Sequence, residues 1–265
     1  MGTIQTQPVG KLLREWRNRR HLSQLDLACD AEISTRHLSF LETGRSQPSR
    51  DMLIHLAEQL DIPLRERNVL LTAAGYAPIF PERPLESSAL EAARKAIDLV
   101  LTGHEPYPAL AIDRHWSLVA SNRAIMPLLA GVDAKLLEPP INVLRLSLHP
   151  QGLAPRIANL PEWRAHLLAR LRRETELTAD PVLAELLKEL SAYPFGAKVH
   201  RQPEIPAYNI PVIPFQLATE GGILSFISTT TIFGTPVDIT LSEIALESFF
   251  PADVATADAL RAMPL

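Results

Sequence analysis

Residues 34–49, STRHLSFLETGRSQPS, place several hydrogen-bonding side chains on one short predicted helix. Leu38 and Leu41, spaced i and i+3, predict the side of this helix that is buried. Side chains on the opposite side can donate to or accept from base edges, and an arginine there suits bidentate contact with guanine. A helix that enters the major groove of DNA needs such side chains near its N-terminus. We therefore expect a DNA-contacting set made of Ser34, Thr35, Arg36, His37, Ser39 and Phe40.

Short helices joined by short turns are predicted on both sides of this segment. Ser23 and Ser34 are good N-cap residues, and Ser49 opens a further helix. Gly44 and Gly75 are good helix stops. Residues 9–75 thus read as five helices of about nine to twelve residues each, which is typical of a compact helical domain.

Charge is unevenly distributed along the chain. The whole sequence has a formal charge of −4, whereas residues 1–75 hold 10 Lys and Arg against 9 Asp and Glu, a net of +1. The stretch KLLREWRNRR contains five basic residues and one acid. A local basic patch of this kind can bind phosphates even on a nearly neutral domain.

Cysteine content and hydropathy restrict the class of protein. Cys29 is the single cysteine of the sequence, so no internal disulfide forms and a reducing compartment is expected. No stretch approaches the roughly 18 apolar residues of a membrane span. We expect a cytoplasmic protein that does not enter a membrane.

The composition changes after Gly75. YAPIFPERPLES contains three prolines in twelve residues, which predicts a linker over residues 76–88. A helix over 89–102 and a mostly helical insert over 122–191 follow. Apolar, β-branched runs predict strands. We expect them over 107–113, 115–121, 208–218, 222–233 and 242–250, with a helix as the alternative for the last of these stretches.

Two strands, then helices, then three strands is the element order of a PAS-type sensor, with one antiparallel sheet and helices on one side. The predicted fold class is therefore α+β. It combines a five-helix domain over 1–75 with a PAS-like antiparallel sheet and helices over 89–265.

The stretch SQLDLACDAEISTRHLSFLETGRSQPS resembles the Cro/repressor (Xre-type) helix-turn-helix family, and the resemblance extends over about residues 9–75. It implies that Gln24 contacts a backbone phosphate and that Thr43 and Arg45 contact phosphate on the other flank. It also implies an ion pair between Arg17 and Glu42. The positions that match the family pattern are Ser23, Gln24, Leu27, Ala28, Ser34, Leu38, Ser39, Leu41, Glu42, Gly44, Pro48 and Ser49.

The remainder of the chain resembles the ligand-binding region of the MmyB-like transcription regulators. The similar stretches are PYPALAIDRHWSLVASNRA, PEWRAHLLARLRRE, DPVLAELLKEL and GTPVDITLSEIALESFFPAD. This resemblance implies a PAS-like domain that senses a small molecule. The sequence departs from the family around His200, where the family more often shows a tryptophan and a His-Pro pair.

Enzymatic and metal-binding functions find little support. The histidines after residue 100 have no H-x-H or H-x-x-x-H spacing, which argues against a metal site. Ala130-Gly131 resembles the bond that self-cleaving repressors cut, but no nucleophilic serine with a lysine partner accompanies it. We predict no catalytic residue, no metal and no cofactor. The run Arg170, Arg172 and Arg173 reads as a solvated helix face, or alternatively as a site for an acidic partner or head group.

A PAS-like sensor would hold its ligand between the sheet and the helical insert. The candidate lining is apolar, which favours a fatty-acyl-like effector, although the same side chains could form ordinary core. The candidates are Trp116, Trp163, Leu167, Leu171, Phe215 and Phe226.

Two functions stay open. The chain is either a DNA-binding regulator that senses a metabolite, or a repressor or antitoxin-like protein whose second domain only oligomerises or binds a protein. In both cases we expect a homodimer, joined mainly through the second domain, on a near-palindromic double-stranded operator.

Overall fold

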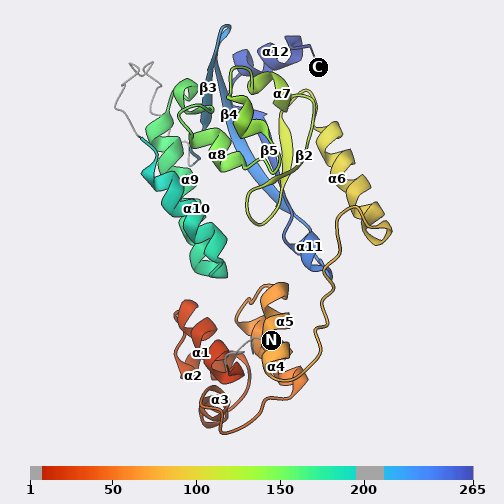
Figure 1. The fold of residues 1–265 in the computed structure, drawn as a ribbon, viewed down its shortest axis with the longest axis vertical. Coiled ribbons are helices and arrows are strands. Elements are labelled where there is room, and N and C mark those ends of the chain that lie inside the picture. The colour runs from red at the N-terminus through yellow and green to blue at the C-terminus, as the bar shows by residue number, and fades with distance from the viewer. Residues whose placement is uncertain (1–7, 195–211, 265) are drawn as a thin grey trace. The chain divides into compact units, whose positions relative to one another are not determined.

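The computed structural model describes residues 8–194 and 212–264, and the chain divides into two compact units (Figure 1). The first unit consists of Met1–Arg83 together with the short segments Glu176–Thr178 and Pro236–Ser242. The second consists of Pro84–Thr175, Ala179–Thr235 and Glu243–Leu265. The predicted domain boundaries at residues 75 and 89 stay predictions.

Five helices form most of the first unit. The capping residues explain where three of them begin, because the hydroxyls of Ser23, Ser34 and Ser49 each accept a hydrogen bond from the first turn that follows. Ser23 and Asp26 form a reciprocal capping box. The helices are α1 (Val9–Arg19), α2 (Gln24–Asp30), α3 (Thr35–Glu42), α4 (Arg50–Gln59) and α5 (Leu64–Ala73). The short α11 (Ile239–Ser242) also belongs to this unit.

An apolar cluster holds these helices together. Leu13 of α1, Leu27 of α2 and Leu38 of α3 are each fully buried in it, along with leucines of α4 and α5. Leu25, also on α2, does not join this core, because it is 61% exposed. The amphipathic pattern therefore places all five helices α1 to α5 in one core, and that core fixes the orientation of α3.

The second unit contains a five-stranded antiparallel sheet in the order β2-β1-β5-β4-β3. Chain neighbours pair at both edges, and β5 lies between β1 and β4. The strands are β1 (Ala109–Ile112), β2 (Leu118–Ser121), β3 (Phe215–Thr219), β4 (Gly222–Ile232) and β5 (Ala245–Pro251). Register pairs Phe215 with Phe226, and Leu110 with Glu247.

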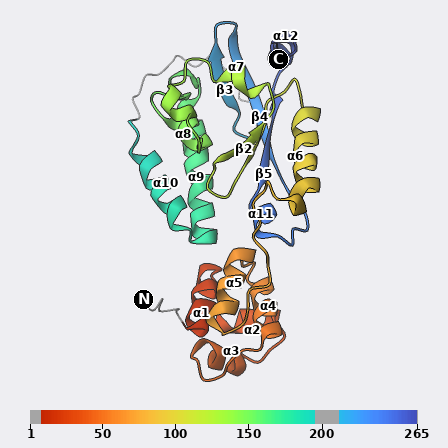
Figure 2. The same cartoon turned by 45° about the vertical axis from the view of Figure 1, so that its right-hand side comes forward.

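Helices lie on both faces of this sheet. Figures 1 and 2 show α8, α9 and α10 on one side and α6 on the other. The expectation of helices on one side only was therefore incomplete. The helices are α6 (Glu91–Gly103), α7 (Ile125–Leu128), α8 (Val143–Leu148), α9 (Leu160–Thr178), α10 (Pro181–Ala192) and α12 (Val254–Ala262). Three 3₁₀ turns accompany them: η1 (Ser88–Leu90), η2 (Ala134–Leu137) and η3 (Ala154–Arg156).

The predicted fold class is confirmed: a helical first part and an antiparallel sheet with helices. The last predicted strand exists as β5. The strand predicted over 208–218 begins only at Phe215, directly after Pro214, because proline cannot donate to the ladder. Residues 208–211 of that prediction, and His200, lie outside the described residues.

Candidate DNA-binding surface and ligand cavity

The helix α3 presents the predicted polar side chains away from the core. Leu38 and Leu41 are fully buried and anchor it, while the Ser34 hydroxyl accepts a hydrogen bond from the His37 amide at 3.1 Å. Thr35 and Arg36 are exposed at its N-terminal turn. His37, Ser39 and Phe40 are half-buried. The structure thus brings the predicted set together on one surface.

Phe40 lies near two arginines of this surface. The guanidinium carbon of Arg36 is 5.3 Å from the centroid of the Phe40 ring, and that of Arg45 is 5.8 Å away. Both distances fall within the range of a cation–π contact. These contacts restrain two exposed arginines, and restrained side chains lose less conformational entropy when they bind.

A buried ion pair connects α1 to the end of α3, as the sequence predicts. The Arg17 Nε donates to Glu42 Oε1 at 2.6 Å and its Nη2 to Oε2 at 3.0 Å. The hydrogen bond to Glu42 raises the pKa of Arg17, so its guanidinium stays charged at all ordinary pH values. The Gln24 amide also donates to Glu42 Oε2 at 2.8 Å. This bond sets the position of Gln24; its expected phosphate contact stays a prediction.

The C-terminal end of α3 carries the remaining predicted phosphate contacts. Thr43 and Arg45 are both exposed there. The Thr43 hydroxyl donates to the Ser39 carbonyl at 2.6 Å, which fixes its rotamer. Gly44 has a φ of +72°, a left-handed conformation that ends the helix and turns the chain at Arg45.

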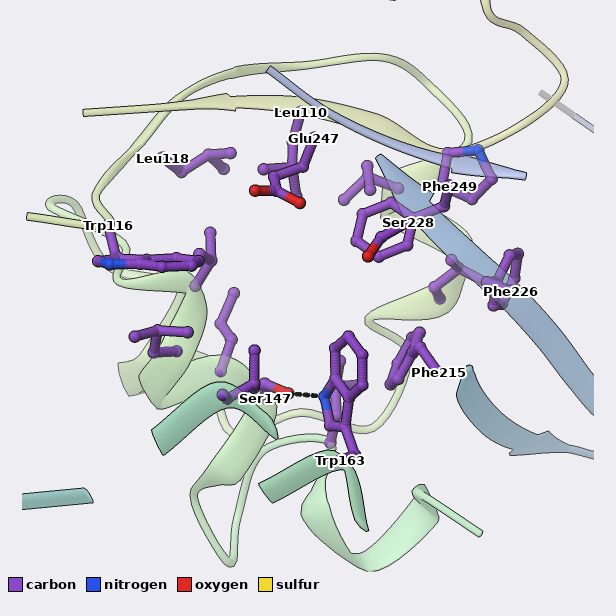
Figure 3. A pocket seen from close by; sticks show the side chains of 18 of the residues that line it. Leu110, Trp116, Leu118, Ser147, Trp163, Phe215, Phe226, Ser228, Glu247 and Phe249 are labelled. Carbon is purple, nitrogen blue, oxygen red and sulfur yellow. Dashed lines mark hydrogen bonds between the residues drawn. The ribbon is translucent and has the colours of Figure 1, made fainter. Parts of the chain in front are cut away.

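A cavity of about 110 Å³ lies in the second unit, between the sheet and helices α7–α9 (Figure 3). Its wall is mostly leucine, isoleucine and aromatic side chains. The lining residues are Pro108, Leu110, Trp116, Leu118, Ile125, Leu128, Leu129, Val143, Leu144, Leu146, Ser147, Leu153, Trp163, His166, Leu167, Arg170, Phe215, Phe226, Ser228, Glu247 and Phe249.

Five of the six predicted pocket residues lie in this wall. Trp116, Phe215 and Phe226 line it from the sheet side, whereas Trp163 and Leu167 line it from α9. Leu171 does not line the cavity; its side chain packs within the same apolar core. That these residues bind an effector stays a prediction.

A charged group that the sequence did not single out as pocket lining also faces the cavity. Arg170 lies over the Trp116 ring, 4.4 Å from its centroid, and its Nη2 is 2.7 Å from Glu247 Oε1. Its Nε donates to Glu174 Oε1 at 3.2 Å. Arg170 is therefore not part of a solvated face. The sequence does carry a signal for this position. Arg170 follows Trp163 by seven residues and Leu167 by three, and residues at these spacings share one side of a helix.

His166 borders the same end of the cavity. It stacks on Trp163 with ring centroids 5.5 Å apart, and the Trp163 Nε1 donates to the Ser147 hydroxyl at 2.9 Å. Burial, and then the neighbouring charge of Arg170, lowers the pKa of His166. The imidazole is therefore mainly neutral at pH 7.

Metal and membrane sites were sought in the described parts of the chain. No group of three or more His, Cys, Asp or Glu side chains there has an arrangement that could hold a metal ion. Within residues 8–194 and 212–264, no helix is both long and apolar enough to cross a bilayer.

Models of known protein families match both parts of the chain. The family model "MmyB-like transcription regulator ligand binding domain" matches residues 93–263, and a "Helix-turn-helix" model matches residues 13–67. A curated protein of Methanoculleus marisnigri, "Putative HTH-type transcriptional regulatory protein", is 35% identical over 124 residues. That alignment covers 45% of this chain and 40% of the relative, so the chain spans about two fifths of the relative's length.

Among solved structures, "Structure of an RNA-binding Light-Oxygen-Voltage Receptor" aligns with 96% of this chain and 64% of that chain, at 9% identity and a TM-score of 0.26. The family models together cover the helix-turn-helix and most of the sheet-containing unit. The chain belongs to the MmyB-like transcription regulators, with an Xre-type helix-turn-helix for DNA binding and the ligand-binding domain of that family.

Proposed function

We propose that this chain binds a near-palindromic operator as a homodimer and changes its operator affinity when a small apolar molecule occupies the cavity. The apolar cavity between the sheet and α9 carries this proposal. A second domain that only oligomerised would need no such internal space. The cavity therefore favours the sensor over the purely oligomerising alternative.

The volume of the cavity limits the size of the effector that it can hold. An engineered cavity of about 150 Å³ takes up benzene, and this one measures about 110 Å³. In the present conformation it therefore suits only a small ring or a short alkyl chain. A longer fatty-acyl chain, which the lining chemistry also fits, requires the helices to move outward.

DNA recognition is assigned to α3. Arg36→Ala is expected to cost about 1–3 kcal/mol on the operator and to relax preference at one base pair. Arg45→Ala, or Gln24→Ala, is expected to weaken operator and random DNA by the same factor, with a shallower salt dependence. Fluorescence anisotropy with both DNAs measures these effects. Equal loss on both DNAs for Arg36→Ala would remove its role in base recognition.

The proposed dimer is supported by the small extent of the recognition element. One α3 covers a single half-site, and a two-fold axis places a second copy about one DNA turn away. Sedimentation velocity at micromolar concentration is expected to give a dimer. A monomer both free and on the operator would contradict this part of the proposal.

A further inference from the structure

One stretch of β4 has an edge that β3 does not cover. β4 extends from Gly222 to Ile232, but its pairing with β3 ends at the pair formed by Phe215 and Phe226. On its other side, β4 pairs with β5 as far as Ile232. Figure 1 shows β4 continuing past the start of β3 toward α11. Residues 227–232, here called the β4 overhang, are therefore paired on one side only in the part of the chain that the structure describes.

Backbone groups of alternate residues point out of this edge. The Ala252 amide donates to the Ser225 carbonyl at 2.8 Å, so the groups of Ser225 point to the β5 side of the strand. The N–H and C=O of one residue point to the same side, and the side alternates along a strand. The N–H and C=O groups of Ser228, Thr230 and Ile232 therefore point to the uncovered side.

Irregular segments cover the outer edges of the sheet elsewhere. Beside β2, the Leu118 amide donates to the Ile141 carbonyl at 2.7 Å. Beside β3, the Ala158 amide donates to the Gln216 carbonyl at 2.9 Å. Such cover prevents a sheet edge from pairing with another chain. Within residues 8–194 and 212–264, no segment covers the β4 overhang in this way.

The sequence of the β4 overhang, ISTTTI, also lacks the residues that protect an exposed edge. It contains no lysine, no other charged residue and no proline. β-branched residues, which favour strands, make up most of it. Its residues 229–232 are exposed, and Ile232 is 67% exposed. An uncharged and accessible edge of this kind is suited to pairing with another strand.

Two-fold symmetry makes a second copy of this chain the matching partner. Each residue at a two-fold axis meets its own copy, so a charged residue there would oppose a like charge. The β4 overhang has none. An antiparallel pairing centred on Thr230 opposes Thr230 to itself, and Ser228 to Ile232 of the second copy. In this register the outward N–H and C=O groups of all three residues find partners, whereas a shift of the centre to Thr229 or Thr231 leaves one residue unpaired.

We propose that the homodimer forms by antiparallel pairing of the β4 overhang with the same overhang of a second copy, which joins two five-stranded sheets into one. This inference rests on the proposed homodimer and names the surface that joins its copies. Threonine pairs across neighbouring strands stabilise such a pairing. Ser228 also lines the cavity, so the interface borders the proposed effector site.

Cysteine cross-linking tests the centre of the pairing in the full-length protein. Every variant also carries Cys29→Ser, because Cys29 is the single cysteine of the sequence and is exposed. Thr230→Cys is expected to form mainly a disulfide-linked dimer with copper phenanthroline, since opposed residues of a hydrogen-bonded pair have Cα atoms about 5.5 Å apart. Ile223→Cys, exposed on the part of β4 that β3 covers, is the matched control and should stay unlinked.

The register has a test of its own. Thr229 of one copy opposes Thr231 of the other when the pairing is centred on Thr230. After subunit exchange, a mixture of Thr229→Cys and Thr231→Cys is therefore expected to give about 5-fold more covalent dimer than either variant alone.

A proline variant tests the backbone hydrogen bonds. Thr230→Pro removes an amide that faces the second copy and not β5, so the sheet itself should persist. Thr230→Ala keeps the amide and loses the same hydroxyl, which donates to Glu247 at 2.9 Å, so it is the matched control. The dimer dissociation constant, measured by sedimentation, is expected to rise about 10-fold or more in Thr230→Pro and to stay within about 3-fold in Thr230→Ala. If circular dichroism shows that Thr230→Pro does not fold, the cross-linking comparisons decide.

The outcomes separate the surface from the dimer. A dimeric protein in which Thr230→Cys cross-links no better than Ile223→Cys would overturn the β4 interface and leave the proposed homodimer in place. Equal dissociation constants for folded Thr230→Pro and Thr230→Ala would do the same. An unaltered protein that is monomeric both free and on the operator would overturn the homodimer as well.

Discussion

Arg17 and Glu42 are among the few charged residues buried in the described part of the chain, and their side chains are only 9% and 1% exposed. Each satisfies the other, and Gln24 completes the network. Removing one partner leaves an uncompensated buried charge. The loss of folding free energy is then far larger than the net free energy that the intact pair contributes.

Arg17→Ala is therefore expected to lower the unfolding free energy of the helical unit by about 3–5 kcal/mol. The double change Arg17→Met with Glu42→Leu is expected to cost much less, because no charge is stranded. Urea unfolding followed by circular dichroism measures both. A double variant as unstable as Arg17→Ala would show that the stranded charge is not what makes the single change costly.

His166 gives the second unit a pH dependence with a definite sign. Its pKa in the folded protein lies below the ordinary value of about 6.5, mainly because of burial. Below pH 6.5 the unfolded chain takes up the proton first, so the stability falls as the pH falls, until the folded form is protonated too. Above that pH the group adds no further change.

His166→Gln removes this titration. The stability difference between pH 8 and pH 5 is expected to be smaller in the variant than in the unaltered protein, measured by urea unfolding at each pH. Parallel curves for the two proteins would mean that His166 does not bind its proton more weakly in the folded state.

At the scale of residues, the sequence predicts the apolar side chains that line the cavity better than the charged ones. Trp163 and Phe215 lie on the apolar side of α9 and β3, and the apolar character of Trp116 marks it in the turn between β1 and β2. Arg170 was read as solvated because charged side chains usually lie at the surface, and its partner Glu247 is distant in sequence. Only the register of β5 and the position of α9 bring these two together.

At the scale of elements, the approach of α1 to α3 decides how the recognition helix is held. A Cβ added at Gly10 would lie 2.3 Å from the Leu41 carbonyl oxygen and 2.8 Å from that of Glu42. Both are backbone atoms, so neither can rotate away. Glycine is required here by close contact between two helices rather than by an unusual φ.

Gly10→Ala is expected to destabilise the helical unit by about 1–3 kcal/mol or more, as overpacking does, and to weaken DNA binding because α3 shifts. Gly103→Ala at the end of α6, where nothing lies within 4 Å of the added atom, is the matched control and should be neutral. Thermal unfolding and operator binding compare the two. Equal stability of both variants would show that α1 and α3 separate at little cost.

The elements themselves were largely predictable. Serine caps and glycine stops placed the five helices, and apolar runs placed the strands. The position of α6 on the face of the sheet opposite α8–α10 was not predictable (Figure 2), because an amphipathic pattern tells which side of a helix is buried but not against which face.

At the scale of the whole molecule, the proposal couples two ligands. If an effector changes the operator affinity by some factor, the operator changes the effector affinity by the same factor. The effector must therefore bind two arrangements of the protein unequally. Filling the cavity with protein atoms should mimic part of this effect.

The most direct test measures operator affinity by fluorescence anisotropy in the ligand-stripped protein, the same protein reloaded with its co-purified molecule, and Leu167→Trp. Leu99→Trp, on a 72% exposed position of α6, controls for the added ring. The account predicts that reloading changes the affinity by about 5–150-fold, that Leu167→Trp changes it in the same direction, and that Leu99→Trp leaves it unaltered. Operator affinities within twofold of one another in all four folded proteins would contradict the account.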